Sequence, residues 1–369
     1  MEWAGAFGDL GTMIPFVFGY IAVVGMDPFG VLLALGLAMV ASGAYYRTPM
    51  PVQPMKAIAA IAITQAAQTV VVTPAVIVAA SLATGAIWLV LGLTGAAARL
   101  AGLVPAAVAT GIVLGLGLGF MAGGLRMMAS HWAIAAAGLS GTVLLLRSRR
   151  MPAMFALLLF GLASGALLEP GTVDAIVERP MALRAPAIVL DELSWDALLA
   201  GTLLLALPQL PLTLGNAIIA IRNENNRLFP DRPVSERRVA ISTGLINLAS
   251  AAIGGIPMCH GAGGMAGHVA FGARTGGALI IVGSSLAILA VCFSASVEAL
   301  FRLFPVALLG VMLFLAGGQL TIGCRPFDNR WPDRIVTLLT AGFAIWNVGA
   351  AFVVGLVAAG LIRRLQARS

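Results

Sequence analysis

Apolar runs of about 20 residues recur along the whole chain, and they constrain the fold more than any other feature. A helix of that length spans the roughly 30 Å hydrocarbon core of a bilayer. Only 10% of the residues are charged, whereas about a quarter are charged in an ordinary globular protein. The chain is therefore predicted to be an all-α integral membrane protein. A soluble enzyme, a secreted disulfide-rich domain and a nucleic-acid-binding module are excluded.

The hydropathy pattern predicts about fourteen segments, some of them too short to cross the bilayer fully. The longest polar interruption separates seven segments from seven others, which gives a first repeat at 1–168, an external loop at 169–193 and a second repeat at 194–369. The predicted segments are 7–25, 28–46, 54–68, 73–97, 104–122, 131–146, 151–168, 194–221, 237–253, 262–273, 276–297, 303–321, 333–345 and 347–365.

The arginines give the predicted orientation. With both termini in the cytoplasm, 17 cationic residues lie in inward-facing loops or the C-terminal tail and 4 lie outside. This asymmetry is the one that the positive-inside rule requires. We therefore expect a multi-pass protein of the cell membrane, in contact with lipid, with both termini cytoplasmic.

Two segments differ from ordinary spanning helices. The stretch 48–56 contains three prolines and a lysine, and the stretch 254–264 contains five glycines, a proline and a histidine. Each opens the third segment of its half, and the second half enters the membrane in the opposite sense because seven is odd. Interrupted helices at matching positions of an inverted repeat are typical of secondary transporters with a site at the midplane. The alternative at either stretch alone is a packing kink.

The first stretch predicts a helix start that could bind an anion. Pro54 suits the first helical position, where its missing N–H has no cost. Gln53 would then be the cap, and the N–H groups of Met55, Lys56 and Ala57 would point into the membrane centre.

The second stretch predicts a matching helix start. Gly261, Gly263 and Gly264, with Ala262 between them, leave backbone amides that a bound oxygen could approach closely. Two such helix ends supply about +0.5 charge each and together favour an anion. His260 precedes them and has two open interpretations: a ligand contact or titrating group, or a buried histidine bonded to a backbone carbonyl.

Lys56 is the only lysine in the chain. An ammonium near the bilayer centre costs about 2.5–3.5 kcal/mol and needs a partner. One interpretation is an ion pair with Asp9; the other is that Lys56 neutralises a bound anion and Asp9 modulates it. Two helix ends and Lys56 sum to roughly +2, and an ionised Asp9 lowers this to roughly +1. We hypothesise that protonation of Asp9 couples a proton to dianion uptake.

Segment eight adds polar side chains on one helical face. Gln209, Thr213 and Asn216 follow the spacing i, i+4, i+7, and Thr12 has the corresponding place in segment one. We predict that Gln209, Asn216 and Thr12 donate hydrogen bonds to the substrate. Hydrogen bonds between neighbouring helices are the alternative, favoured for Thr213.

Three long motifs carry a resemblance to a known family. They are residues 5–12 (Gly-Ala-Phe-Gly-Asp-Leu-Gly-Thr) with Ile14-Pro15, residues 49–56 (Pro-Met-Pro-Val-Gln-Pro-Met-Lys), and residues 257–264 (Pro-Met-Cys-His-Gly-Ala-Gly-Gly) followed by Phe271-Gly-Ala-Arg274. In this order they resemble the molybdate transporter family related to the sulfate permeases. Typical sulfate permeases carry a regulatory domain of the STAS type after the last helix, and we expect none in this protein.

The resemblance implies a seven-plus-seven inverted repeat, with a core domain from segments 1–4 and 8–11 and a gate domain from segments 5–7 and 12–14. Segments 3 and 10 would be half-helices. It also implies an oxyanion substrate, molybdate first, with sulfate as competitor.

We therefore expect a secondary active transporter that imports a tetrahedral oxyanion, without cofactor or metal, and with a homodimer as one expected assembly. A sulfate or other anion transporter of the same fold is the alternative. An anion channel would need a continuous polar pore, whereas the polar residues cluster at one level. A membrane enzyme is not expected, because three histidines without metal-ligand spacing offer no catalytic cluster.

Overall fold

The computed structural model describes residues 2–64, 71–97, 99, 105–145, 153–171, 193–323 and 331–366. Within these ranges the chain is almost entirely helical, and the one sheet of this described part has two short strands. Helices occur in all fourteen predicted segments. Most of the long outer loop predicted at 169–193 lies outside the described residues.

The elements of the first half are α1 (Glu2–Ala6), α2 (Leu10–Ala22), α3 (Pro28–Tyr46), β1 (Gln53–Pro54), α4 (Lys56–Thr64), α5 (Pro74–Leu93), α7 (Ala106–Met128), α8 (Trp132–Leu145) and α9 (Ala153–Leu168). Those of the second half are α11 (Trp195–Ala200), η2 (Gly201–Ala206), α12 (Leu207–Leu212), η3 (Thr213–Ala220), α13 (Ile221–Leu228), α14 (Glu236–Ala252), β2 (Met258–Cys259), α15 (Ala262–Ala270), α16 (Gly277–Leu303), α17 (Val306–Gly323), α18 (Trp331–Trp346) and α19 (Val348–Gln366).

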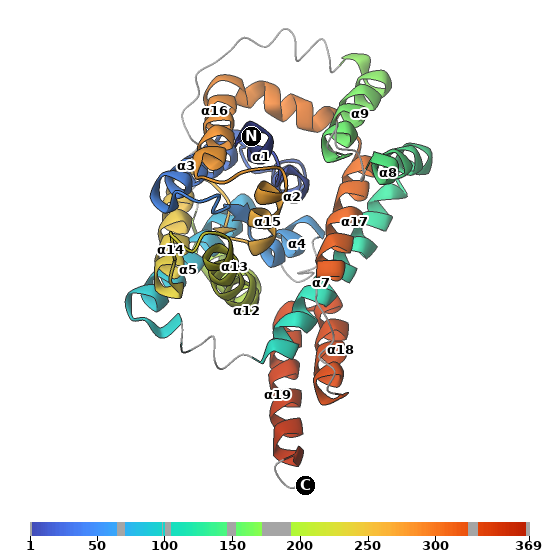
Figure 1. The fold of residues 1–369 in the computed structure, drawn as a ribbon. Helices are drawn as coiled ribbons and strands as arrows, with labels where there is room; N and C mark the ends of the chain where they lie inside the picture. Colours follow the sequence, from blue (N-terminus) through green and yellow to red (C-terminus); the bar gives the residue numbers. More distant parts are fainter. Residues whose placement is uncertain are drawn as a thin grey trace.

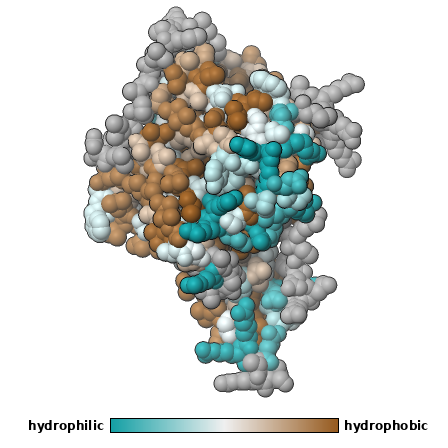
Figure 2. Space-filling model, turned by 60° about the vertical axis from the view of Figure 1, so that its left-hand side comes forward, coloured by the Kyte–Doolittle hydropathy of each residue, from teal (hydrophilic) through white to brown (hydrophobic). Residues whose placement is uncertain are grey.

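The surface carries the apolar side chains that a bilayer requires. Six helices in the described residues are long and apolar enough to cross a membrane. Large apolar side chains on their outer faces are exposed, among them Leu37, Val90 and Val353. Figure 2 shows that hydrophobic residues cover much of the visible face, while hydrophilic residues gather in one region. A continuous apolar surface of this extent marks contact with lipid.

Helix packing has the two-fold pattern of an inverted repeat. The second helix of the first half packs on the fourth of the second half (α3 on α16), and the fourth of the first half packs on the second of the second half (α5 on α14). The fifth helix of each half packs on the sixth helix of the other half, as α7 on α18 and α17 on α8. Within each half the sixth helix packs on the seventh, as α8 on α9 and α18 on α19. The two halves are therefore related by a pseudo-two-fold axis, as the sequence predicts.

The axis passes through the contact between α7 and α17. A Cβ atom on Gly317 would lie 2.5 Å from the Gly117 carbonyl oxygen, and one on Gly117 would lie 2.8 Å from the Gly317 oxygen. The two backbones therefore touch, which is the close approach that small residues permit between membrane helices. Figure 1 shows α4 and α15 in the middle of the larger group of helices, with α7, α17, α18 and α19 to one side.

Two helices differ in detail from the prediction. Segment one, predicted at 7–25, becomes helical only at Leu10 in α2, and a turn at 7–9 separates it from the short preceding helix α1. Segment eight is a continuous helix of 34 residues, Trp195–Leu228, in which two π-helical stretches flank the prolines Pro208 and Pro211. Proline removes a backbone donor and disturbs the regular ladder, and π-helical turns often occur at functional sites.

Candidate functional site

Two extended segments cross in the interior, and each leads directly into a half-helix. β1 and β2 pair antiparallel, with Gln53 opposite Cys259 and Pro54 opposite Met258. All four residues are buried. Because the strands run in opposite directions, α4 and α15 leave the crossing in opposite senses with their N-terminal ends close together. This is the arrangement that the paired interruptions predict.

Side chains from neighbouring helices satisfy the backbone of these extended segments. Asn247 on α14 binds Met258 twice, donating from Nδ2 to its carbonyl (2.6 Å) and accepting from its N–H at Oδ1 (2.9 Å). The Ser42 hydroxyl on α3 donates to the Met50 carbonyl at 2.7 Å. Irregular backbone at membrane depth persists only where such partners replace water.

The start of α4 differs from the prediction. The helix begins at Lys56, two residues later than predicted, and Pro54 belongs to β1. Gln53 is therefore not the helix cap. Strand pairing of Pro54 with Met258 holds this part of the chain extended, and it outweighs the preference of proline for a first helical position.

Protein groups already occupy most of the amides at the start of α4. The Met55 N–H donates to the Pro257 carbonyl at 2.9 Å. Gln209 Oε1 accepts from the Ala57 N–H at 2.8 Å and from the Ile58 N–H at 3.3 Å. The prediction that Met55 and Ala57 offer free amides is wrong. In the described structure only the first residue of the helix keeps an N–H without a protein acceptor.

Gln53 is bonded to Asp9 instead of capping a helix. Its Nε2 donates to both carboxylate oxygens of Asp9, each at 2.7 Å. Asp9 is 5% exposed and precedes α2 at the turn that divides segment one. The carboxylate and the amide thus form one buried polar unit between α2 and β1.

The turn between α1 and α2 packs on α15. A Cβ atom on Gly8 would lie 2.5 Å from the Gly267 carbonyl oxygen, so the two backbones are in contact. The His268 Nδ1 atom lies 2.7 Å from the Gly5 carbonyl oxygen. A carbonyl only accepts, so this nitrogen carries the proton. These contacts hold the turn against the C-terminal part of α15, and the Asp9 side chain reaches its first turn at Gly264.

The start of α15 is open, in contrast to that of α4. Gly261 is the cap residue and offers no side chain. The N–H groups of Ala262 and Gly263 donate to no residue that the structure describes, and the Gly264 N–H bonds back to the Gly261 carbonyl at 3.0 Å. Gly263 is exposed, with no described atom within 4 Å of where its Cβ would lie. Two accessible backbone donors therefore remain at this helix end.

The glycines of this turn leave room for the Gln53–Asp9 unit. A Cβ atom on Gly261 would overlap Gln53 Oε1. One on Gly264 would lie 2.7 Å from Asp9 Oδ2 and 2.7 Å from Gln53 Nε2. Gly261 and Gly264 must therefore lack side chains so that Gln53 and Asp9 can pack against them, and this also leaves the amides accessible.

Lys56 is buried without a partner in the described part of the chain. It is 7% exposed, and its ammonium forms no hydrogen bond or ion pair with any residue in the described ranges. The predicted alternative of an ion pair with Asp9 is therefore wrong, because Gln53 occupies that carboxylate. Lys56 is the first residue of α4, so its backbone lies next to the crossing of β1 and β2, and β2 leads into α15.

The polar residues of segment eight have separate roles. Gln209 is 1% exposed and its Nε2 donates to the Thr213 hydroxyl at 3.0 Å, so both ends of the amide are engaged within the protein. Asn216 is half-buried, and its Nδ2 lies 3.4 Å from where a Cβ of Gly261 would be. Its amide makes no hydrogen bond with the described residues. Thr12 lies in α2, and its side chain is outside the description.

The ring of His260 faces the protein and not the open helix end. Its Nδ1 lies 2.8 Å from the Pro51 carbonyl oxygen, and its Nε2 lies 2.8 Å from the Ser242 hydroxyl. The Tyr46 hydroxyl in turn lies 2.6 Å from that of Ser242. This arrangement matches the interpretation of His260 as a buried histidine bonded to a backbone carbonyl.

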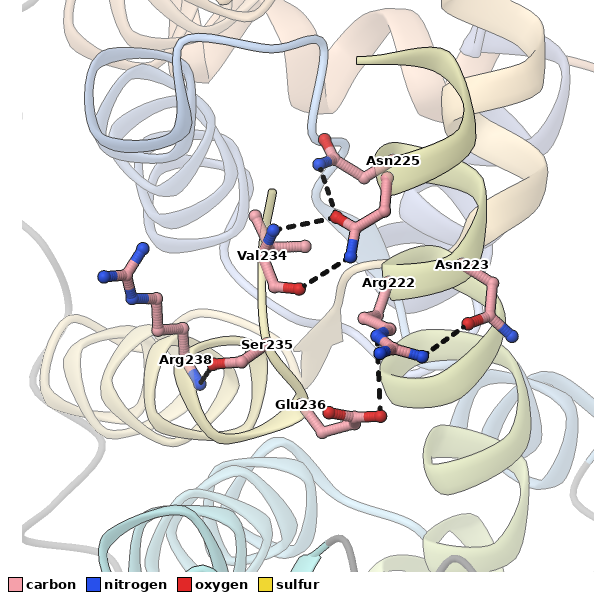
Figure 3. A network of polar contacts seen from close by, with 8 residues as sticks. Arg222, Asn223, Asn225, Val234, Ser235, Glu236 and Arg238 are labelled. Carbon is pink, nitrogen blue, oxygen red and sulfur yellow. Dashed lines mark hydrogen bonds and ion pairs between the residues drawn. The ribbon is translucent and has the colours of Figure 1, made fainter. Parts of the chain in front are cut away.

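The polar residues at the C-terminal end of segment eight, in α13, form structural contacts. Asn225 is fully buried and its Oδ1 accepts from the Thr48 hydroxyl at 2.8 Å. Asn226 binds the backbone of Val234 through both atoms of its amide. Figure 3 shows the polar contacts around Asn225 and Val234, between α13 and the start of α14. These contacts fasten the α13–α14 connection to the segment that leads into β1.

Comparison with known proteins finds relatives along most of the chain. Residues 1–120 and 201–320 match a family model described as "Molybdate transporter of MFS superfamily". Molybdate transporter 2 of Arabidopsis thaliana is 32% identical over 398 residues, which cover 95% of this chain and 84% of that protein. Molybdate transporter 1 of the same plant is 29% identical, covering 96% of this chain and 86% of that protein.

Solved structures share the fold. The murine anion transporter Slc26a9 in its inward-facing state gives a TM-score of 0.72 at 12% identity, over 99% of this chain and 68% of that one. The transmembrane domain of the cyanobacterial bicarbonate transporter BicA gives 0.63 at 14% identity, over 97% and 96%. At such identities the likeness concerns the fold alone, and it is the seven-plus-seven inverted repeat that the helix packing indicates.

Proposed function

Because the chain belongs to the molybdate transporter family, we propose that it is a secondary active transporter that imports a tetrahedral oxyanion, with molybdate as the substrate. The protein is a multi-pass membrane protein of a transporter family and is not an enzyme. The relatives are named molybdate transporters, which supports this substrate over other anions.

The observation that carries the proposal is a buried cation, unpartnered among the described residues, at the start of one half-helix, and an open helix end on the other. Both half-helices begin at the crossing of β1 and β2. Lys56 supplies a full positive charge, and the free amides at the start of α15 supply hydrogen-bond donors and the positive end of a helix dipole. Asn216 adds a neutral donor next to Gly261. Together these groups offer a dehydrated dianion both charge and hydrogen bonds between the two half-helices.

Transport in this proposal follows from movement of a core domain against a gate domain. The core comprises α1–α5 and α11–α16, and the gate comprises α7–α9 and α17–α19. The site belongs wholly to the core, so a shift of the core past the gate would carry the anion across the bilayer. The excess of arginines in alternate loops supports a cell-membrane protein with both termini in the cytoplasm.

Uptake by the purified protein in liposomes tests the function. We expect accumulation of labelled molybdate, competition by excess tungstate and sulfate, and no competition by excess nitrate, because a monovalent anion matches fewer of the positive groups. The alternative, a transporter for sulfate, predicts that sulfate accumulates and molybdate competes weakly. A channel predicts that uptake stops when the substrate concentrations on both sides are equal, even with an imposed proton gradient. Absence of both molybdate and sulfate uptake would contradict the proposal.

Asp9 is proposed to couple uptake to protons. An ionised Asp9 beside the site reduces the net positive charge available to a dianion, and protonation removes that penalty. Uptake by the unaltered protein should therefore rise as the external pH falls. Asp9→Asn keeps a side chain of the same shape and should transport at a rate that is independent of pH. A pH profile of Asp9→Asn that matches the unaltered protein would assign the coupling elsewhere.

A further inference from the structure

The two half-helices are not equivalent at their N-terminal ends. An α-helix leaves its first N–H groups without intrahelical acceptors. In α4 the donors of Ala57 and Ile58 are both taken by Gln209 Oε1. In α15 the donors of Ala262 and Gly263 have no acceptor among the described residues. The protein thus closes one helix end with its own side chain and leaves the other open.

Burial shows the same difference. Gln209 is 1% exposed and its partner Thr213 is fully buried, so these two side chains fill the space beside the amides of α4. Gly263, by contrast, is exposed and faces open space in the described structure.

The two N–H groups of α4 fix the orientation of the Gln209 amide. The amide can present either its oxygen or its NH₂ group to α4, and only the oxygen can accept from the two N–H groups. With the oxygen facing the helix, Nε2 faces Thr213, whose hydroxyl accepts from it at 3.0 Å. Gln209 and Thr213 together therefore provide an uncharged acceptor for the N–H groups at the start of α4.

We propose that the substrate anion is held asymmetrically, by the open amides of α15 and the Lys56 side chain, and that Gln209 is a positioning residue that takes the place of a substrate oxygen on α4. This rests on the proposed function. It replaces the symmetrical arrangement predicted from sequence, and it removes Ala57 and Gln209 from the set of substrate ligands. The neutral amide closes α4 without adding a negative charge beside the anion.

Two substitutions separate positioning from direct contact. Gln209→Met keeps the side-chain length and removes the acceptor. Gln209→Glu keeps an acceptor oxygen for both amides and adds a negative charge. Both variants are studied as full chains in nanodiscs, with hydrogen–deuterium exchange of the peptide spanning 55–62 and calorimetric titration with molybdate.

Opposite patterns are expected in the two variants. In Gln209→Met, the amide hydrogens of Ala57 and Ile58 should exchange at least tenfold faster than in the unaltered protein. The Kd for molybdate should change by less than about threefold, because no substrate contact is lost. Gln209→Glu should show the exchange of the unaltered protein and a Kd raised at least tenfold, because its charge opposes the dianion. A purely structural role would leave the Kd of Gln209→Glu unchanged.

Other outcomes would overturn the inference. A tenfold higher Kd in Gln209→Met with unaltered exchange would make Gln209 a direct ligand. An unchanged Kd in Gln209→Glu would show that the α4 end does not influence the anion. If the unaltered protein binds no molybdate, the proposed function fails, whereas exchange in Gln209→Met still decides whether Gln209 closes α4.

Discussion

Replacing Gly261 with alanine should reduce molybdate uptake by about a hundredfold while leaving the protein folded. The added methyl group would overlap Gln53 Oε1. That atom is the end of a flexible side chain, so Gln53 can move and the helices need not separate. Moving it disrupts the two hydrogen bonds to Asp9 and changes the position of a charge beside the site. A displacement near 1 Å of a positioned group typically costs about two orders of magnitude in rate.

Gly119→Ala is the matched control, because Gly119 also lies in a membrane helix and a Cβ atom added there would have no described atom within 4 Å. Uptake per folded molecule, with the folded fraction taken from size-exclusion chromatography, is the measurement. The control should transport at the rate of the unaltered protein. If Gly261→Ala also did so, the contact between Gln53 and the first turn of α15 would have no role in transport.

The fold can be predicted from the sequence because its main constraints are local. A bilayer fixes the length of each apolar run, and prolines and glycines mark the two places where a helix cannot continue. The proline-rich stretch contains the extended segment β1, and the glycine-rich stretch contains β2, at the same place in each half. The inverted repeat follows from the odd number of segments in each half, and needs no knowledge of any contact.

The partners within the site cannot be predicted in the same way. Gln209 and Ala57 are 152 positions apart, and the spacing of Gln209, Thr213 and Asn216 shows a shared face without showing what it meets. The local sequence predicts that Gln53 caps α4 because Pro54 follows it, but a strand pairing with Met258 outweighs that local preference. Contacts between residues far apart in the sequence determine the partners of both Gln209 and Gln53.

One further set of residues supports the site and was missed, although the sequence holds a signal for it. Thr243, Asn247 and Ser250 lie at i, i+4, i+7 on α14, in the mostly apolar part of that helix. Asn247 and Ser250 bond the backbone of the glycine-rich stretch, Ser250 through the Ile256 carbonyl at 2.8 Å. A polar stripe at membrane depth facing an interrupted segment predicts this kind of support, because that backbone has no water to bond.

Replacing Lys56 with methionine should weaken molybdate binding by about a thousandfold. A unit charge at about 4 Å from another, with an effective dielectric constant near 20, contributes about 4 kcal/mol, which corresponds to about three orders of magnitude in Kd. Lys56→Arg retains the charge with a different geometry and should bind within about tenfold of the unaltered protein. Calorimetric titration with molybdate measures both variants.

Lys56→Met should also make the ligand-free protein more stable. Lys56 is buried and has no hydrogen bond or ion pair with the described residues, and an unpartnered ammonium at membrane depth costs about 2.5–3.5 kcal/mol. Methionine fills a similar volume without that cost, so the unfolding temperature of Lys56→Met should rise while binding is lost. A structural lysine predicts the reverse, a lower unfolding temperature in the absence of substrate. Both signs follow from the proposal that the transported anion, and not a side chain of the described residues, compensates the positive charge of Lys56.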